Sequence, residues 1–151
     1  VAVRGVVGEQ LVERLGAGRP PRPLVGVDLF PDLGAIHASL STALFLFTAI
    51  SGAWGLVTYS RGRGVGASYW GILACLELLA LAQALVGGAM LLAGEQPARL
   101  VHILYGIVSV VTLPGAYAFT RGRDDRQAAL TYALICLFLL GVSLRAASTA
   151  R

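Results

Sequence analysis

Long apolar runs alternate with short polar segments from residue 33 onward, and this pattern predicts the fold. Four such runs place spans at about 33–60, 66–94, 98–120 and 127–146. A helix needs about 20 apolar residues to cross the hydrocarbon core of a bilayer. A single full charge, Glu77, falls inside these runs away from their ends. Because a helix satisfies its own backbone hydrogen bonds in lipid, the chain is predicted to be an all-α, polytopic membrane protein.

Residues 1–32 follow a different pattern. In VAVRGVVGEQLVERLG, apolar residues recur every four positions, at Val3, Val7, Leu11 and Leu15. That spacing suits a short amphipathic helix lying on a surface. The following AGRPPRPL reads as an extended, proline-stiffened linker. We therefore divide the chain into an N-terminal segment, 1–32, and a four-helix transmembrane domain, 33–148.

An internal repeat runs through that domain. Each half carries a histidine, an apolar run, an R-G-R loop and a second run with C-L-x-L-L. The histidines are His37 and His102, and the two cysteines are Cys75 and Cys136. Duplication of a two-helix unit keeps its orientation in the membrane. The repeat predicts an up-down four-helix bundle made of two tandem hairpins, related by a pseudo-two-fold axis along the membrane normal.

The two histidines are candidate metal ligands. Both stand near the start of odd-numbered spans, so both are expected at the same membrane face. Two imidazoles facing each other can supply both axial ligands of a b-type haem, and the lack of C-x-x-C-H excludes c-type attachment. Arg99 and Arg145 are expected at that face, where guanidinium groups suit haem propionates. Tyr105, one turn after His102, is expected to line the cavity.

Other roles for these residues stay open. A histidine near the end of a span is often interfacial, with its polar tip in water, and either histidine could instead ligate a chlorophyll-type pigment. Glu77 lies near the middle of the second run, where an ionised carboxylate costs at least about 2.5 kcal/mol. It is expected to face the bundle interior or to be protonated. Glu77 could relay protons, or it could simply bond a neighbour such as Gln83.

These features favour a small integral membrane cytochrome-b-like subunit with one haem b for electron transfer. One alternative is a cofactor-free accessory subunit of a larger membrane complex, and another is a proton- or solute-conducting protein that uses Glu77. No nucleophile–base pair, Walker loop, dinucleotide fingerprint or zinc spacing is present, so an enzyme acting alone is not expected. The arrangement is similar in outline to small four-helix membrane cytochromes b and to one half of haem A synthase. In haem A synthase the ligands lie on even-numbered helices, so its activity is not carried over.

Charge and aromatic placement suggest the setting. The chain has twelve arginines, no lysine and a net charge of +4, with basic residues scattered among loops and tails, so nucleic acid is not an expected partner. Loops 61–63 and 121–126 hold five arginines against one, Arg99, in the loop between them. The positive-inside rule then places both R-G-R loops in the cytoplasm and both termini outside a bacterial cytoplasmic membrane. Expected partners are the bilayer, other subunits of an electron-transfer complex, or a second copy.

Seven aromatic residues are expected at headgroup level near the R-G-R loops: Trp54, Tyr59, Tyr69, Trp70, Tyr117, Phe119 and Tyr132.

Overall fold

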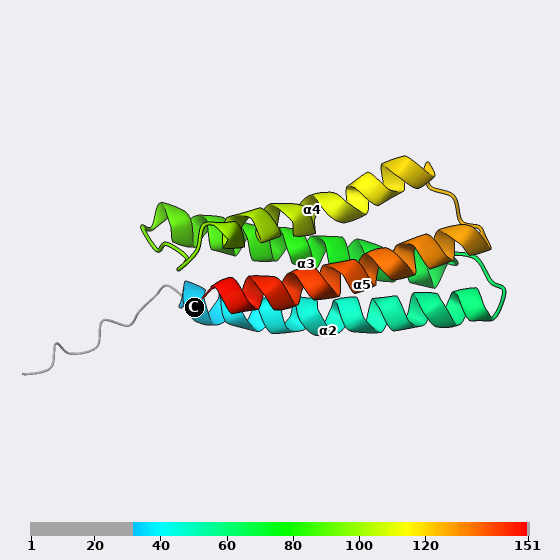
Figure 1. Cartoon of the computed structure of the whole chain (residues 1–151), viewed down its shortest axis with the longest axis horizontal. Coiled ribbons are helices and arrows are strands. Elements are labelled where there is room, and N and C mark those ends of the chain that lie inside the picture. The colour runs from blue at the N-terminus through cyan, green and yellow to red at the C-terminus, as the bar shows by residue number, and fades with distance from the viewer. Residues whose placement is uncertain (1–31, 151) are drawn as a thin grey trace, which may run out of the picture. The chain divides into compact units, whose positions relative to one another are not determined.

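The computed structural model describes residues 32–150, which form four α-helices (Figure 1). They are α2, Leu33–Ser60; α3, Ala67–Leu92; α4, Val101–Thr120; and α5, Arg126–Thr149. All four are long and apolar enough to cross a membrane. The prediction of an all-helical chain with four apolar spans is therefore confirmed, with helix ends within three residues of those predicted. The amphipathic segment and linker predicted for residues 1–31 lie outside the described residues.

Local chemistry fixes where the helices begin and end. The Asp32 carboxylate caps α2 by accepting hydrogen bonds from the amides of Gly34 and Ala35, at 2.9 and 3.2 Å. Asp125 caps α5 in the same way by accepting from the amide of Ala128. Short aspartate side chains suit this role because they reach the unpaired amides of the first turn. Both R-G-R loops turn through a glycine with positive φ, +70° and +67°, a conformation that glycine adopts without strain.

The helices pack in a closed ring. Helix α2 packs on α3 and α5, and α4 packs on the same two helices, so α2 and α4 are diagonally opposite. Figure 1 shows the chain reversing direction at each connection, with α4 diverging from the others toward its C-terminus. Many large apolar side chains point outward, among them Leu85 (74% exposed) and Phe119 (85% exposed). Such a surface matches a lipid environment, in which outward apolar groups are not exposed to water.

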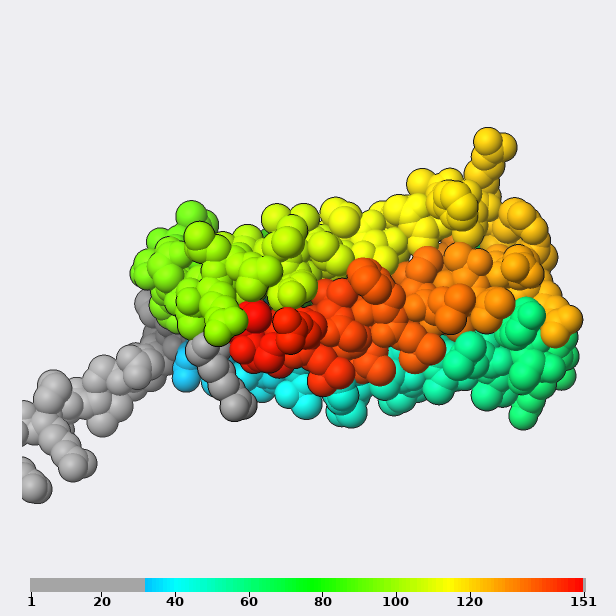
Figure 2. Space-filling model, viewed as in Figure 1, coloured from blue at the N-terminus to red at the C-terminus, as the bar shows by residue number. Residues whose placement is uncertain are grey.

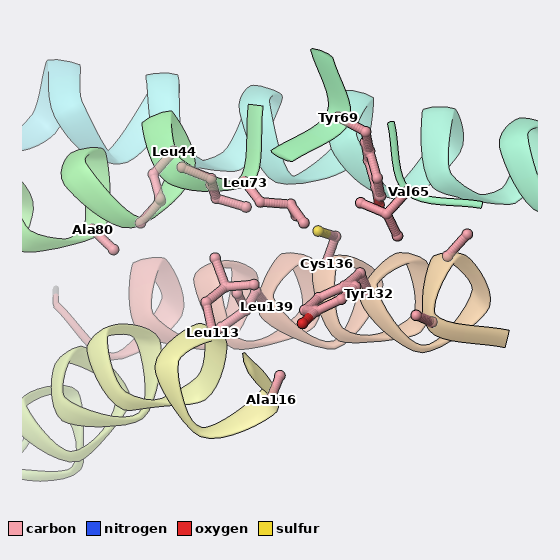
Figure 3. Packing of buried hydrophobic residues seen from close by; sticks show 13 residues of the cluster. Leu44, Val65, Tyr69, Leu73, Ala80, Leu113, Ala116, Tyr132, Cys136 and Leu139 are labelled. Atoms are coloured by element: carbon pink, nitrogen blue, oxygen red, sulfur yellow. The ribbon is translucent and has the colours of Figure 1, made fainter. Parts of the chain in front are cut away.

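The buried core lies in the middle of the bundle and toward the R-G-R loops (Figure 3). There Tyr69 of α3 and Tyr132 of α5 are 2% and 1% exposed. The Tyr69 hydroxyl donates to the carbonyl of Ser51, and the hydroxyl groups of Tyr132 and Thr120 are hydrogen-bonded to each other at 2.7 Å. The expectation that all seven aromatic residues lie at headgroup level stays a prediction, but these two rings are enclosed between helices and do not lie on the surface of the bundle. Their hydroxyl groups have protein partners, which makes burial acceptable.

Trp70 joins three helices at the same end of the bundle. Its ring packs edge-to-face against Tyr117 of α4 and Tyr132 of α5, with centroid separations of 5.7 and 5.1 Å. The two loops are also joined, since the Val65 amide donates to the Asp124 carbonyl at 2.7 Å. Aromatic pairs of this geometry each contribute about 0.5–1.5 kcal/mol beyond their buried area. These contacts therefore link α3, α4, α5 and the two loops at the R-G-R end.

The repeated C-L-x-L-L strings occupy different environments. Cys136 is fully buried and points toward Leu73 in Figure 3, whereas Cys75 is exposed on the outside of α3. Both cysteines are free. Residues that correspond in the two halves of the sequence thus differ in what surrounds them.

Toward the other end, the buried residues lie on α5, at Val142, Ser143 and Thr149. No residue of 33–43 or 81–112 is fully buried. Figure 2 shows the last turns of α5, in red, lying against the segment that leads into α4. Both histidines lie at this end.

Candidate functional site

The two histidines meet inside the bundle although their helices are diagonally opposite. The ring centroids of His37, on α2, and His102, on α4, are 6.1 Å apart, and the ring planes are inclined at 60°. Both side chains are half-buried. Because α2 and α4 do not pack on each other directly, this contact is made by side chains that cross the middle of the bundle.

The orientation of His102 is fixed by α5. Its Nδ1 lies 3.0 Å from the backbone carbonyl oxygen of Ala146. A carbonyl oxygen only accepts, so Nδ1 carries a proton, and in the neutral ring Nε2 then carries the lone pair. Metal-ligating histidines commonly have one ring nitrogen held by a carbonyl in this way. His102 is thus in the tautomer that a ligand at Nε2 requires.

His37 is oriented by α3. Its Nε2 lies 3.2 Å from the side-chain amide of Gln83. Its Nδ1 and the Gln83 Oε1 are both buried with no partner among the described residues. The amide oxygen and nitrogen of Gln83 can be exchanged, but either assignment leaves His37 Nδ1 unpaired. An unsatisfied buried polar group costs about 1–3 kcal/mol. A ligand that bonds His37 Nδ1 would remove this cost.

Gly87 makes room for the His37 ring. A Cβ at Gly87 would lie 3.0 Å from His37 Cε1 and 3.6 Å from its Nδ1. The nitrogen-bearing edge of the ring therefore faces α3 rather than His102. Sequence reasoning missed the contacts of Gln83, Gly87 and Ala146 with the histidines. Gln83 was recognisable as a polar residue in the second run, but we considered it as a partner of Glu77, and the structure pairs it with His37 instead.

Arg99 lies close to His102 in the sequence. Arg145 lies close to it across the bundle, on α5. The His102 amide donates to the Arg99 carbonyl at 3.0 Å, and Arg145 directly precedes Ala146. Both arginine side chains are exposed, and neither has an ion-pair partner within residues 32–150. Tyr105 is half-buried, and its hydroxyl bonds neither imidazole. The carbonyl of Ala146 and the amide of Gln83 orient the rings in its place.

Glu77 lies apart from the histidines. It stands six residues before Gln83, which is about 9 Å along α3. It also follows Trp70 by seven residues, about two turns, so it projects from the same flank of α3, the one on which Trp70 contacts α4. The side chain is half-buried, and its Oε2 is buried without a partner in the part of the chain that the structure describes. The structure therefore does not bring Glu77 and the histidine pair into one site.

The histidine pair limits which metal centre could form. Within residues 32–150 no group of three or more His, Cys, Asp or Glu side chains could hold a metal ion. Two nitrogen ligands are too few for a structural zinc site, which takes four protein ligands. A haem iron already has four porphyrin nitrogens and takes axial ligands from the protein. The donor set therefore suits a macrocyclic metal complex better than a bare ion.

No protein-family model, curated protein or solved structure matches this chain. What the protein does is therefore inferred from its own residues and their geometry.

Proposed function

We propose that the protein is a small integral membrane cytochrome-b-like subunit that holds one haem b between His37 and His102. The separation of the two rings carries this proposal. A ligating imidazole nitrogen lies about 2 Å from its metal, so two nitrogens on one iron are about 4 Å apart. Their ring centroids must be somewhat further apart, and the observed 6.1 Å is of that size. Bound haem would supply one-electron transfer.

The two histidines differ in how much each must rearrange to bind the haem iron. His102 has Nε2 free and its other nitrogen held by Ala146. His37 would have to release Gln83 and turn from Gly87 toward His102. Coordination would compensate for that loss, because His37 Nδ1 is now buried without a partner. The lack of fully buried residues over 33–43 and 81–112 leaves this end able to rearrange around a macrocycle.

The remaining predicted residues have roles at the membrane face. Arg99 and Arg145 are exposed beside His102 and have no carboxylate partner within residues 32–150, and they would bind the propionates through paired N–H···O contacts. Tyr105 would form part of the cavity wall. A chlorophyll-type pigment, which also takes an axial imidazole, is the competing ligand.

We propose the following setting for this subunit. Two tandem hairpins form an up-down bundle about a pseudo-two-fold axis, with the R-G-R loops on the cytoplasmic side of a bacterial membrane and the termini outside. The five arginines of those loops support this orientation. Other subunits of an electron-transfer complex, or a second copy, would exchange electrons with the haem.

An absorption spectrum of the purified protein, oxidised and then dithionite-reduced, tests the haem proposal. After incubation with haemin we expect a b-type α-band on reduction, at one haem per chain. His37→Ala and His102→Ala should each abolish the six-coordinate spectrum, whereas Cys75→Ala, on the exposed side of α3, should keep it. Absence of stoichiometric haem in the wild type, or an unchanged spectrum in either histidine variant, would contradict the proposal.

A second candidate function is proton conduction through Glu77. It is favoured by the buried and unpartnered Oε2 of that carboxyl group, because an ionisable residue inside a span is a functional hypothesis by default. Proteoliposomes loaded with a pH-sensitive dye would measure the flux. Glu77→Gln should abolish the proton flux, since an amide side chain does not take up or release protons near neutral pH. Wild-type flux in that variant would exclude the relay, and absence of both haem and flux would leave a cofactor-free accessory subunit.

A further inference from the structure

An open cavity lies at the end of the bundle opposite the histidines. Its volume is about 370 Å³, and its lining comes from the last two turns of α2 and the following loop. The lining residues are Trp54, Val57, Thr58, Arg61 and Arg63. Ligand pockets in proteins run from about 300 to 1,000 Å³, so a small headgroup fits. The part of the cavity lined by Trp54 and Val57 is apolar, and the part lined by Arg61 and Arg63 is cationic.

No carboxylate of residues 32–150 pairs with the positive charge of this cavity. Among the five arginines at this end, Arg123 pairs with Asp125, and Arg126 lies 4.5 Å from the centre of an aromatic ring. Arg61 and Arg63 have no carboxylate partner within residues 32–150, and both are exposed. Two guanidinium groups are therefore available to an anion.

The helix end beneath these arginines does not repel an anion strongly. The C-terminus of a helix carries partial negative charge on its unpaired carbonyls. Here the carbonyls of Val57, Thr58 and Tyr59 accept hydrogen bonds from backbone amides of the R-G-R loop, at 2.9–3.1 Å. The Thr58 hydroxyl also makes no hydrogen bond within the described residues, whereas those of Thr42 and Thr48 donate to carbonyls of their own helix. Thr58 thus offers a free donor inside the cavity.

We propose that this cavity binds the phosphodiester headgroup of an anionic phospholipid such as phosphatidylglycerol. Arg61 and Arg63 would contact the phosphate oxygens, because guanidinium groups match phosphate geometry. Thr58 would donate a further hydrogen bond. Basic pockets on the cytoplasmic side of a membrane bind anionic lipid headgroups, so this step rests on the orientation proposed above for the R-G-R loops.

The apolar half of the cavity favours a lipid over a free anion. Trp54 and Val57 are 44% and 46% exposed directly below the arginines, on a helix apolar enough to span a membrane. Tryptophan prefers the headgroup level, where its ring would lie against the glycerol and the first acyl carbons. Inorganic phosphate would use only the cationic half.

Tryptophan fluorescence of the detergent-solubilised full chain tests the proposal. Short-chain phosphatidylglycerol should give a saturable change that phosphatidylcholine does not, and Trp54→Phe should remove most of the signal. Each arginine near a membrane surface contributes about fivefold in affinity. Arg61→Gln and Arg63→Gln should therefore each weaken the apparent Kd about fivefold, and Thr58→Val by a smaller factor.

Arg121→Gln is the matched control, because it removes the same charge from the other R-G-R loop outside the cavity. It should change the Kd less than about twofold, and circular dichroism should show equal helicity in all variants. An equal loss in Arg121→Gln would mean attraction by the whole basic face and would overturn the site. Equal binding of phosphatidylcholine would overturn it too. Full competition by inorganic phosphate at the same concentration would show a free-anion site instead.

Discussion

The unpaired nitrogen of His37 is the residue-scale feature on which the candidate site depends. One edge of its ring lies over Gly87, one nitrogen bonds Gln83, and the other bonds nothing in the described chain. Apart from the bond with Gln83, only packing against α3 holds this side chain in place. A ligand that takes the free nitrogen, or a change in the shape of α3, should therefore move it.

Gly87 and Gly88 form a matched pair for testing this. Alanine in place of a helical glycine stabilises a helix by about 1 kcal/mol. Gly88→Ala should give this gain, since no atom of residues 32–150 lies within 4 Å of its added methyl group. Gly87→Ala should give less or lose stability, because its methyl group would lie 3.0 Å from His37 Cε1. Thermal unfolding in detergent measures both. An equal gain in the two variants would show that His37 does not lie over Gly87.

At the scale of elements, Gly55 determines how closely three helices pack together. A Cβ at this position of α2 would overlap the Tyr69 hydroxyl of α3 and lie 2.7 Å from the Cβ of Ala133 on α5. Three helices therefore approach one another because this residue has no side chain. We expect Gly55→Ala to destabilise the bundle by about 1–3 kcal/mol, the usual cost of overpacking. Gly71→Ala, which meets no atom within 4 Å, serves as the control, and a Gly55→Ala protein that unfolds like it would contradict this packing.

The start of α5 should make stability depend on pH. The Ala128 amide and the Arg123 guanidinium hold the pKa of Asp125 below its usual value. A depressed carboxyl pKa gives stability that is present above the unfolded pKa and is lost as pH falls through the folded pKa. Thermal unfolding measured from about pH 7 down to about pH 3 should thus show a loss at the acid end. Asp125→Asn should reduce that loss, and an unchanged profile in this variant would assign it to other carboxylates.

At the scale of the whole molecule, the two ends of the bundle are held together by different contacts. Aromatic contacts of Trp70 and the bond between Val65 and Asp124 join the R-G-R end. The histidine end has no fully buried residue over 33–43 and 81–112. Regions with few buried contacts open at lower free energy, so a cofactor or partner would find access at the histidine end.

Cysteine labelling decides which end faces the cytoplasm. Gly66→Cys and Gln96→Cys, made in a chain lacking Cys75 and Cys136, report on the two ends. Gly66 is exposed with open space around it, whereas a Cβ at Gly64 would overlap the Asp124 carbonyl. A membrane-impermeant thiol reagent added to intact cells should label Gln96→Cys and spare Gly66→Cys. The reverse pattern would contradict the proposed orientation.

The sequence predicted the four spans well because span length and hydropathy are local properties. It also placed both histidines at one end, since odd-numbered spans start on the same side. It predicted poorly which polar groups meet. Gln83 was one candidate partner for Glu77 but bonds His37, and the burial of Tyr69 and Tyr132 between helices was not predicted. Such pairings depend on how each helix is rotated about its axis.

The sequence by itself therefore determined the class of protein, the number of spans and the end at which the imidazoles lie, because each follows from the order of apolar and polar residues along the chain. The tertiary structure alone decided that α2 and α4 are diagonal, that His37 and His102 are 6.1 Å apart, and that Arg61 and Arg63 share a cavity with Trp54. Those facts depend on helix rotation and close packing. Both arise from the sum of many weak contacts between residues distant in sequence.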